Sequence, residues 1–393
     1  MRRGSGAGAR FVQPARAMQP LLTRFVATSP RFVTSQARSL EWLAAAHAES
    51  EATAGGLDDV GRARFRSRIE RAIKRCACSP EKIRQRGQSV GDLDAIDFTN
   101  NVIYDLRNHP RGKGSTARTR LFAEVVDDYF DTTYADEAVP PDDLIHVTCT
   151  GYASPNGAQK LVAHRGWGGA TRITNAYQMG CYASLPALRI AAGFVATGSH
   201  RVDLVHTELC SLHLDPSDHS LEQLVVQSLF GDGLIRYCMV PDQGTRGLRV
   251  LALHERVLPD SADAMSWIVS DAGMQMTLAR DVPERVASAL RGFLVELLAR
   301  AGRDLRHLKG SVFAVHPGGP KIIDRVHDVL ELTEAQVATS RRVLYDHGNM
   351  SSATLPHIWM HLLDDRAIPA GTLIPSLAFG PGLTVCGGLL EKC

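Results

Sequence analysis

The sequence has no long hydrophobic run and no excess of charge, and both absences limit what the protein can be. No uninterrupted apolar stretch approaches the roughly 18 to 20 residues that a membrane-spanning helix needs. The 44 basic and 42 acidic residues leave a formal net charge of only +2, whereas a nucleic-acid-binding protein concentrates a basic excess on one face. We therefore expect a cytoplasmic globular protein that acts on neither membranes nor nucleic acids.

The sequence also lacks the motifs of common metal and cofactor sites. Of the eight cysteines only Cys76 and Cys78 lie close together, and a single C-x-C without further Cys or His pairs is weak support for zinc. No HExxH, GxGxxG or P-loop pattern stands out. In a chain this long without an apolar signal peptide, the cysteines are predicted to be free thiols. We expect no metal and no organic cofactor, and at least one functional thiol.

The first forty residues contain seven arginines and no acidic residue. A mitochondrial transit peptide has this composition, so a targeting segment is one interpretation. Against it, the run PLLTRFVATSP at residues 20–30 is typical of a strand and turn in a folded body. We therefore predict a disordered tail over residues 1–18, with Met18 as a second candidate for the start.

Strand-like and helix-like segments alternate along the rest of the chain, which predicts a layered α/β fold. Residues 19–243 are predicted to form the N-terminal half. Its apolar spacing predicts helices at residues 39–52, 61–75, 92–107, 116–129, 183–195 and 221–229, and buried strands at residues 144–150 and 202–209.

Residues 244–393 are predicted to form a C-terminal half that begins near a polar joint at residues 241–247. Strands are predicted there at residues 248–253, 311–315 and 382–390, and helices at residues 282–301, 321–329 and 334–346. The two halves have a similar order of elements, which indicates an internal duplication.

Cys181 is the thiol whose position most favours chemistry. It stands between a strand-like segment at 172–180 and a helix of small residues at 183–195. Near a helix N-terminus, the dipole and the unpaired N–H groups stabilise a thiolate and lower the pKa of the thiol. The alternative is a buried cysteine that packs as a small apolar side chain.

His316 and Asn349 are candidates for the same chemistry. His316 ends an apolar strand and precedes a Pro-Gly-Gly-Pro turn, which leaves room for a substrate beside the imidazole. Asn349 lies in the small, polar run HGNMSSA. The structural alternatives are a histidine that caps a turn and a loop that supplies a helix N-cap. Together the three residues suit an acylated cysteine, which needs a histidine to help form the thiolate and donors for the oxyanion.

Five short segments in this order resemble the signature motifs of the chalcone-synthase-like type III polyketide synthases. They are Gly180-Cys181-Tyr182-Ala183, Phe230-Gly231-Asp232-Gly233, His316-Pro317-Gly318-Gly319-Pro320, Gly348-Asn349-Met350-Ser351-Ser352 and Phe379-Gly380-Pro381-Gly382. The resemblance extends from about residue 20 to the C-terminus. It implies the duplicated, five-layered αβαβα thiolase fold, usually as a homodimer. It also implies that Cys181 carries the acyl chain, while His316 and Asn349 bind the thioester carbonyl and promote malonyl decarboxylation.

The resemblance assigns further residues to the substrate cavity. Phe230 matches a phenylalanine near the cavity mouth, although ordinary core packing is its alternative, and Met276 stands where plant enzymes carry a second phenylalanine. The other residues assigned to the cavity wall are Cys149, Ser154, Cys210, His213, Trp267 and Ser351. Val226 and Trp267 replace family glycines, so bulky side chains are expected to shrink or redirect the cavity.

Basic residues on an early helix are the expected contact for the phosphates of coenzyme A. Arg68, Arg71 and Lys74 are assigned to this entrance, and Arg75 and Lys82 lie close to them in the sequence. The phosphopantetheine arm of an acyl carrier protein would use the same entrance. The alternative is an ordinary solvated helix face.

The resulting prediction is an acyltransferase that loads an acyl thioester on Cys181 and condenses it with a malonyl or β-ketoacyl thioester. The product would be a pyrone-type or related polyketide. One alternative is a priming β-ketoacyl-carrier-protein synthase with a single condensation, and the Gly-Pro-Gly segment at 380–382 argues against it. Another is a non-catalytic thiolase-fold binding protein, which would not need to keep all three catalytic residues.

Overall fold

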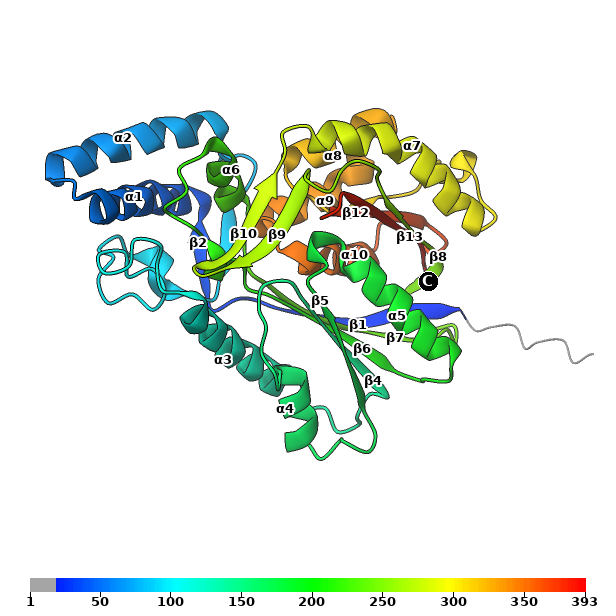
Figure 1. Ribbon diagram of the computed structural model, residues 1–393. Helices are drawn as coiled ribbons and strands as arrows, with labels where there is room; N and C mark the ends of the chain where they lie inside the picture. The colour runs from blue at the N-terminus through cyan, green and yellow to red at the C-terminus, as the bar shows by residue number, and fades with distance from the viewer. Residues whose placement is uncertain (1–18) are drawn as a thin grey trace, which may run out of the picture.

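A nine-stranded mixed sheet runs through the computed structural model, which describes residues 19–393 (Figure 1). The strands stand in the order β11-β12-β13-β8-β1-β7-β6-β4-β5. Their bounds are β1 Pro20–Thr28, β4 Asp143–Thr148, β5 Arg172–Tyr177, β6 Val202–Glu208, β7 Gly233–Pro241, β8 Leu248–Val257, β11 Ala314–Val315, β12 Leu373–Gly380 and β13 Thr384–Lys392. The tail predicted at residues 1–18 lies outside the described residues.

The strand order repeats on the two sides of the contact between β1 and β8. These strands are antiparallel, and Leu22 pairs with Leu248. On one side, β1 pairs antiparallel with β7, β7 antiparallel with β6, and β6 parallel with β4. On the other side, β8 pairs antiparallel with β13, β13 antiparallel with β12, and β12 parallel with β11. This repeat agrees with the predicted duplication, while the boundary at residue 243 stays a prediction.

The helices form three layers around the two parts of the sheet, which confirms the duplicated thiolase-like fold (Figure 1). The central layer is α5 Ser184–Ala196 and α10 Thr354–Asp364. One outer layer contains α3 Ser115–Thr133 and α4 Gly157–His164, and the other contains α7 Val282–Arg300, α8 Pro320–Val329 and α9 Glu334–His347. Three more helices, α1 Gln36–Gly55, α2 Asp59–Cys76 and α6 Leu221–Leu229, pack together beside the first part of the sheet.

Side chains of the central strands alternate between the layers, as the two-residue period of a strand requires. On β12, Ile374 and Ala378 join the central apolar cluster, whereas Leu377 joins the cluster under α7, α8 and α9. On β4, Ile145 faces the central cluster and Leu144 faces the cluster on the side of α3. Both faces of the sheet are therefore buried.

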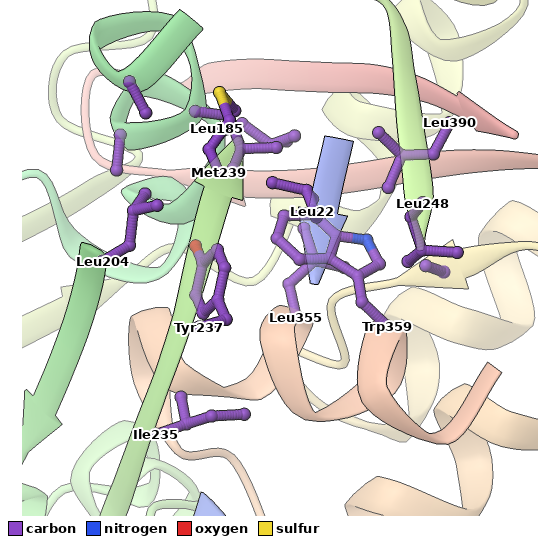
Figure 2. Close-up of a cluster of buried hydrophobic side chains, with 14 of the residues drawn as sticks. Leu22, Leu185, Leu204, Ile235, Tyr237, Met239, Leu248, Leu355, Trp359 and Leu390 are labelled. Atoms are coloured by element: carbon purple, nitrogen blue, oxygen red, sulfur yellow. The ribbon is translucent and has the colours of Figure 1, made fainter. Parts of the chain in front are cut away.

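The central cluster joins both parts of the sheet to α5 and α10. Figure 2 shows Leu355 and Trp359 of α10 pointing toward Leu22 of β1. The indole Nε1 of Trp359 donates a hydrogen bond to Ser376 Oγ over 2.9 Å, which satisfies a polar group inside this apolar layer. Along the described chain, no helix is long and apolar enough to cross a membrane.

Most of the predicted elements are confirmed, but the helix predicted at residues 92–107 is wrong. Only a short 3-10 turn forms there, at Gly91–Asp94. The carboxylate of Asp92 accepts hydrogen bonds from the backbone N–H groups of Val102, Ile103 and Tyr104, at 2.6 to 2.9 Å. These side-chain contacts replace the backbone bonds of a helix and close the segment into a loop.

The sequence analysis also missed elements that carry no clear periodicity. α10 and β12 are buried almost all round, so apolar residues do not alternate with polar ones. β7 and the hairpin of β9 Met265–Ser270 with β10 Gly273–Leu278 were missed as well, as was the short antiparallel pair of β2 Phe32–Ser35 with β3 Gln85–Gln88.

We predict that Leu355→Ala lowers the free energy of unfolding by about 2–5 kcal/mol, because it leaves a cavity in the central cluster. Leu355 is 0% exposed, and the matched control Val139→Ala changes a side chain in a residue that is 65% exposed. Urea unfolding followed by circular dichroism should show a loss of less than about 0.5 kcal/mol for the control. Equal losses in the two variants would contradict the role of the central layer.

Candidate active site

Cys181 lies in a 3-10 turn, Gly180–Tyr182, between β5 and α5. The turn needs a glycine, because Gly180 has a positive φ of 75°. A Cβ atom at Gly180 would also come within 2.8 Å of Pro381 Cδ. The Gly-Cys motif and the Gly-Pro-Gly motif therefore pack against each other. Together they place Cys181 just before the N-terminus of α5.

His316 follows β11 directly and is held by its backbone. Its N–H donates a hydrogen bond to Leu377 O on β12 over 2.8 Å, and Pro320 begins α8 shortly after it. The imidazole is buried, and neither ring nitrogen has a hydrogen-bond partner among the residues described. Both nitrogens are thus available to a ligand.

Asn349 is fixed by the Phe-Gly-Asp-Gly motif at the end of α6. Asn349 N–H donates to Leu229 O, and Gly231 N–H donates to Asn349 O, each over 2.9 Å. The side-chain Oδ1 of Asn349 accepts a hydrogen bond from Ser351 N–H over 2.9 Å. Since Oδ1 is used within the loop, the amide NH₂ is the part of Asn349 that remains for a ligand.

The structure brings Cys181, His316 and Asn349 to the wall of one cavity. This outer cavity has a volume of about 740 Å³ and also includes Phe230 and Met276. A second, inner cavity of about 50 Å³ begins on the other side of Cys181. Cys181, Phe230 and Met276 line both cavities, so Phe230 and Met276, which the resemblance assigned to the substrate cavity, lie at the boundary between the two.

Most of the other residues that the sequence analysis assigned to the substrate cavity line the inner cavity. Its wall includes Cys149, Cys210, His213, Trp267 and Ser351. Its volume of about 50 Å³ leaves room for about four water-sized groups. Its wall also includes Val226, the other bulky residue at a family glycine, which agrees with the expectation of a small cavity.

Ser154 does not belong with this group, which corrects its assignment to the cavity. It is exposed and lines neither cavity, because it lies in the loop that precedes α4.

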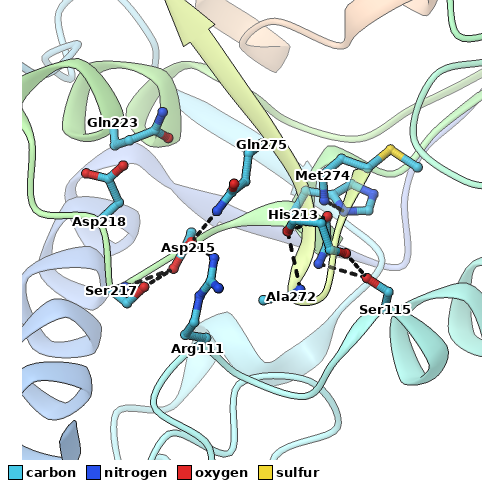
Figure 3. Close-up of polar contacts among 12 residues, drawn as sticks. Arg111, Ser115, His213, Asp215, Ser217, Asp218, Gln223, Ala272, Met274 and Gln275 are labelled. Carbon is cyan, nitrogen blue, oxygen red and sulfur yellow. Dashed lines mark hydrogen bonds and ion pairs between the residues drawn. The ribbon is translucent and has the colours of Figure 1, made fainter. Parts of the chain in front are cut away.

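The hairpin of β9 and β10 forms one wall of the inner cavity and is held by polar contacts (Figure 3). His213 Nε2 donates to Thr150 O over 2.7 Å, and His213 Nδ1 accepts from Met274 N–H over 3.1 Å. Asp215 accepts hydrogen bonds from Gln275 over 2.9 Å and from Arg111 over 2.7 Å. Burial lowers the pKa of His213 to about 3, so the imidazole is neutral, as these two contacts require.

Glu208, at the end of β6, is a site residue that the sequence analysis missed. It is fully buried beside the inner cavity and accepts hydrogen bonds from Cys149 N–H at 3.1 Å, Thr150 Oγ1 at 3.0 Å and Ser352 Oγ. Burial raises the pKa of its carboxyl group, and these donors oppose the rise. No clear sequence signal marked it, because β6 (VDLVHTE) also contains Asp203, His206 and Thr207.

The charge state of Cys181 differs from the sequence-based expectation. Burial raises the pKa of the thiol to about 12, although hydrogen bonding to the side chains of Ser351 and Asn349 opposes the rise. Burial also lowers the pKa of His316 to about 3. Both groups are therefore neutral in the substrate-free protein. For the thiol, the rise in pKa that burial causes is larger than the decrease expected from the N-terminus of α5. Two buried groups offset this cost when they become charged together as an ion pair.

The basic residues at the mouth of the outer cavity are not the three that were assigned. Arg68, Arg71 and Lys74 are exposed on α2 and do not line the cavity. Arg68 instead lies over the ring of Phe65, 5.0 Å from its centroid. The basic side chains that line the outer cavity are Arg75, Lys82, Arg280 and Lys321. The three assigned residues do not line the cavity because it meets Arg75 at the C-terminal end of α2 and the loop after it. Their contact with the phosphates of a donor stays a prediction.

Comparison with known proteins identifies relatives of the chain. The family profile described as "Chalcone and stilbene synthases, C-terminal domain" matches residues 250–393, and the corresponding N-terminal domain matches residues 123–239. Type III polyketide synthase C of Arabidopsis thaliana is 31% identical over 258 residues, which are 63% of this chain and 67% of that protein. The 1,3,6,8-tetrahydroxynaphthalene synthase of Streptomyces griseus is 31% identical over 61% of this chain and 64% of its own length.

Solved structures show the same fold. The type III polyketide synthase domain of Steely1 from Dictyostelium superposes with a TM-score of 0.78 at 24% identity, covering 95% of this chain and 99% of that chain. The 1,3,6,8-tetrahydroxynaphthalene synthase of Streptomyces coelicolor superposes with a TM-score of 0.75 at 23% identity, with the same coverage of each chain.

We predict that His316→Ala slows alkylation of Cys181 by iodoacetamide about tenfold or more near pH 8. In this variant burial still raises the pKa of the thiol, but the imidazole that accepts its proton has been removed. The rate in this variant should keep rising to pH 10, since a raised pKa keeps the thiol protonated at lower pH. Mass spectrometry of the Cys181 peptide measures the rate. Equal rates in the variant and the unmodified protein would show that His316 does not assist the thiol.

Proposed function

The chain belongs to the chalcone and stilbene synthase family, the type III polyketide synthases, and on this premise we propose that it builds a polyketide on Cys181. Members of this family are acyl-transferring, condensing enzymes. The observation that carries the proposal is that Cys181, His316 and Asn349, from three distant segments of the chain, line one cavity.

In the proposed first step the thiol of Cys181 attacks an acyl thioester. The sulfur–carbonyl bond to Cys181 forms, the bond to the donor sulfur breaks, and the donor leaves as a thiol. His316 accepts the proton of Cys181 and returns it to the leaving sulfur. This role suits an imidazole whose two nitrogens have no hydrogen-bond partner within residues 19–393. The NH₂ group of Asn349 stabilises the oxyanion.

In the proposed second step a malonyl or β-ketoacyl thioester enters the outer cavity. Loss of CO₂ from a malonyl group leaves an enolate, whose oxygen is held by His316 and the NH₂ group of Asn349. The enolate carbon attacks the acyl carbonyl on Cys181, and the thiolate of Cys181 leaves. The chain is then released by cyclisation, for which we propose a pyrone-type or related product.

The two cavities favour a short acyl chain and a long donor arm. The inner cavity, at about 50 Å³, accommodates only a few non-hydrogen atoms beyond the thioester. The outer cavity, at about 740 Å³, has room for a pantetheine arm, and its basic mouth suits phosphate groups. We propose coenzyme A or an acyl carrier protein as the donor, and a cytoplasmic homodimer as the working form.

A second candidate function is a priming β-ketoacyl-carrier-protein synthase that makes one condensation. The small inner cavity favours it, because one extension already fills the available space. The number of malonyl units in the product distinguishes the two functions. A non-catalytic binding protein is not supported, because the chain belongs to a family of condensing enzymes.

We predict that intact-protein mass spectrometry shows an acyl adduct after incubation with a panel of acyl-CoA and acyl-carrier-protein thioesters. The adduct should be absent from Cys181→Ala, because that variant lacks the nucleophile. Cys393→Ala, which removes a thiol outside both cavities, should retain it. A folded protein that takes up no acyl group from any donor would refute the proposed function.

We predict that Trp267→Ala admits longer acyl chains and gives products with more extensions. The indole forms part of the inner wall, where its Nε1 donates to Cys149 O over 2.6 Å, and its removal enlarges the cavity. Product masses from a series of acyl thioesters should shift upward relative to those of the unmodified protein. Ile268→Ala, an exposed residue on the same strand, is the control. An unchanged product length in Trp267→Ala would show that this wall does not limit the chain.

A further inference from the structure

A row of basic side chains runs along α2 to the mouth of the outer cavity. The members of this arginine row are exposed and are Arg64, Arg68, Arg71 and Arg75. They follow one another at intervals of four, three and four residues, so they lie on one face of the helix. With a rise of about 1.5 Å per residue, the row is about 16 Å long. Arg75, at its end, lines the outer cavity.

The charges of the arginine row are not neutralised within the protein, although α2 forms ion pairs on its other faces. Arg62 pairs with Asp59 over 2.6 Å, and Arg66 pairs with Glu70 over 3.0 Å. The four arginines of the row form no ion pair with any residue of the described chain, 19–393. Like charges three and four residues apart on a helix repel each other. The row therefore destabilises α2 unless an opposite charge meets it.

The basic surface continues around the mouth of the outer cavity. Three more exposed basic residues line this mouth and are Lys82, Arg280 and Lys321. The acidic side chains in the same wall already have partners. Glu222 accepts a hydrogen bond from Leu278 N–H over 2.6 Å, and Asp324 pairs with Arg341 over 2.6 Å. An anionic group that approaches the mouth from the side of α2 therefore meets unpaired positive charge.

The length of the arginine row exceeds what coenzyme A needs. Coenzyme A carries its phosphates at the end of the pantetheine arm, so an arm inside the outer cavity leaves them at the mouth, beside Arg75. Arg68 and Arg64 lie about 10 Å and 16 Å farther along the helix. A carrier protein that brings its arm to the same mouth has a surface large enough to cover α2.

Other anionic macromolecules fit the arginine row less well. A helix that binds a lipid surface keeps an apolar face free, whereas Ile69 and Ile73 of α2 are buried in the protein. The formal net charge of the chain is only +2, and a nucleic-acid-binding protein has a larger basic excess. Figure 1 shows α2 along the outer edge of the molecule, where a protein partner has access to it.

We propose that the arginine row is the docking surface for an acidic acyl carrier protein, which delivers its phosphopantetheine arm into the outer cavity. Carboxylates of the carrier protein pair with Arg64, Arg68 and Arg71, and the phosphate of the arm lies at the mouth. Such charged contacts speed the encounter of the two proteins and fix their orientation. The inference rests on the proposed function, because it names the donor that loads Cys181.

Two variants with the same change of charge test this surface. The row variant combines Arg64→Glu and Arg68→Glu, and it leaves Arg75 at the cavity unchanged. The control variant combines Arg291→Glu and Arg303→Glu, which reverse two exposed charges that line neither cavity. Glutamate is a good helix former, and the melting temperature of each variant shows whether it is folded.

The first measurement is binding of a fluorescent apo acyl carrier protein of bacterial fatty-acid synthesis, followed by anisotropy at about 0.15 M salt. The apo form has no arm, so its binding reports the protein surface alone. We expect Kd to be about tenfold or more higher for the row variant, because the reversed charges repel the partner, and unchanged for the control. Equal Kd values for the two variants, or no binding to the unmodified protein, would overturn the proposal. Tighter binding of a DNA oligonucleotide or an anionic vesicle would overturn it as well.

The second measurement is KM for loading of Cys181 from an acyl carrier protein thioester and from acyl-CoA. In the row variant, KM for the carrier thioester should rise about tenfold or more. KM for acyl-CoA should rise less than about threefold, because salt screens exposed charges more than about 8 Å apart. An equal rise for both donors would contradict the proposal, because the row would then serve the phosphates that both donors share.

The two measurements also separate this inference from the proposed function, since binding of the apo carrier protein involves no chemistry. A carrier protein that binds through the arginine row while no donor loads Cys181 would refute the proposed function and support the docking surface. Loading from acyl-CoA without any binding of the carrier protein would support the proposed function and refute the docking surface.

Discussion

The packing of α5 and α10 between the two parts of the sheet is the constraint on which the rest of the structure depends. Each part of the sheet turns one apolar face toward these helices. Cys181 stands just before α5, and Asn349 stands just before α10. Burial of the two helices therefore brings the thiol and the amide to one cavity. The candidate site is a consequence of how the core packs. His316 joins it from the end of β11, a strand of the same sheet.

Burial also sets the charge states in the site. It raises the pKa of the Cys181 thiol and of the Glu208 carboxyl, and it lowers the pKa of His316 and His213. Each isolated charge is disfavoured where the group is buried, whereas a pair of opposite charges offsets part of the cost. Cys181 and His316 are therefore neutral in the substrate-free protein, and in the proposed mechanism proton transfer accompanies bond formation.

Two residues of the family motifs, Asp232 and Gly348, hold the chain in place and line neither cavity. Asp232 accepts hydrogen bonds from the backbone N–H groups of Ser89 and Ser211, and so ties the end of α6 to two distant loops. Gly348 has a positive φ, and a Cβ atom there would lie within 2.7 Å of Leu229 O. These residues fix the loop of Asn349, which explains on physical grounds why they accompany a reactive residue.

The sequence by itself determined the fold class, most helices and strands, and the three residues Cys181, His316 and Asn349. Local periodicity and short motifs contain that information, because both depend on neighbours along the chain. Only the tertiary structure decided which residues share a cavity: it removed Ser154, and it placed Arg75 and not Arg68 in the wall of the outer cavity. It also placed Glu208 behind the wall of the inner cavity, where the carboxylate accepts a hydrogen bond from Cys149 N–H. It also reversed the expected pKa shift of Cys181. Burial and contact between distant segments arise from packing, and no pattern of neighbouring residues records them.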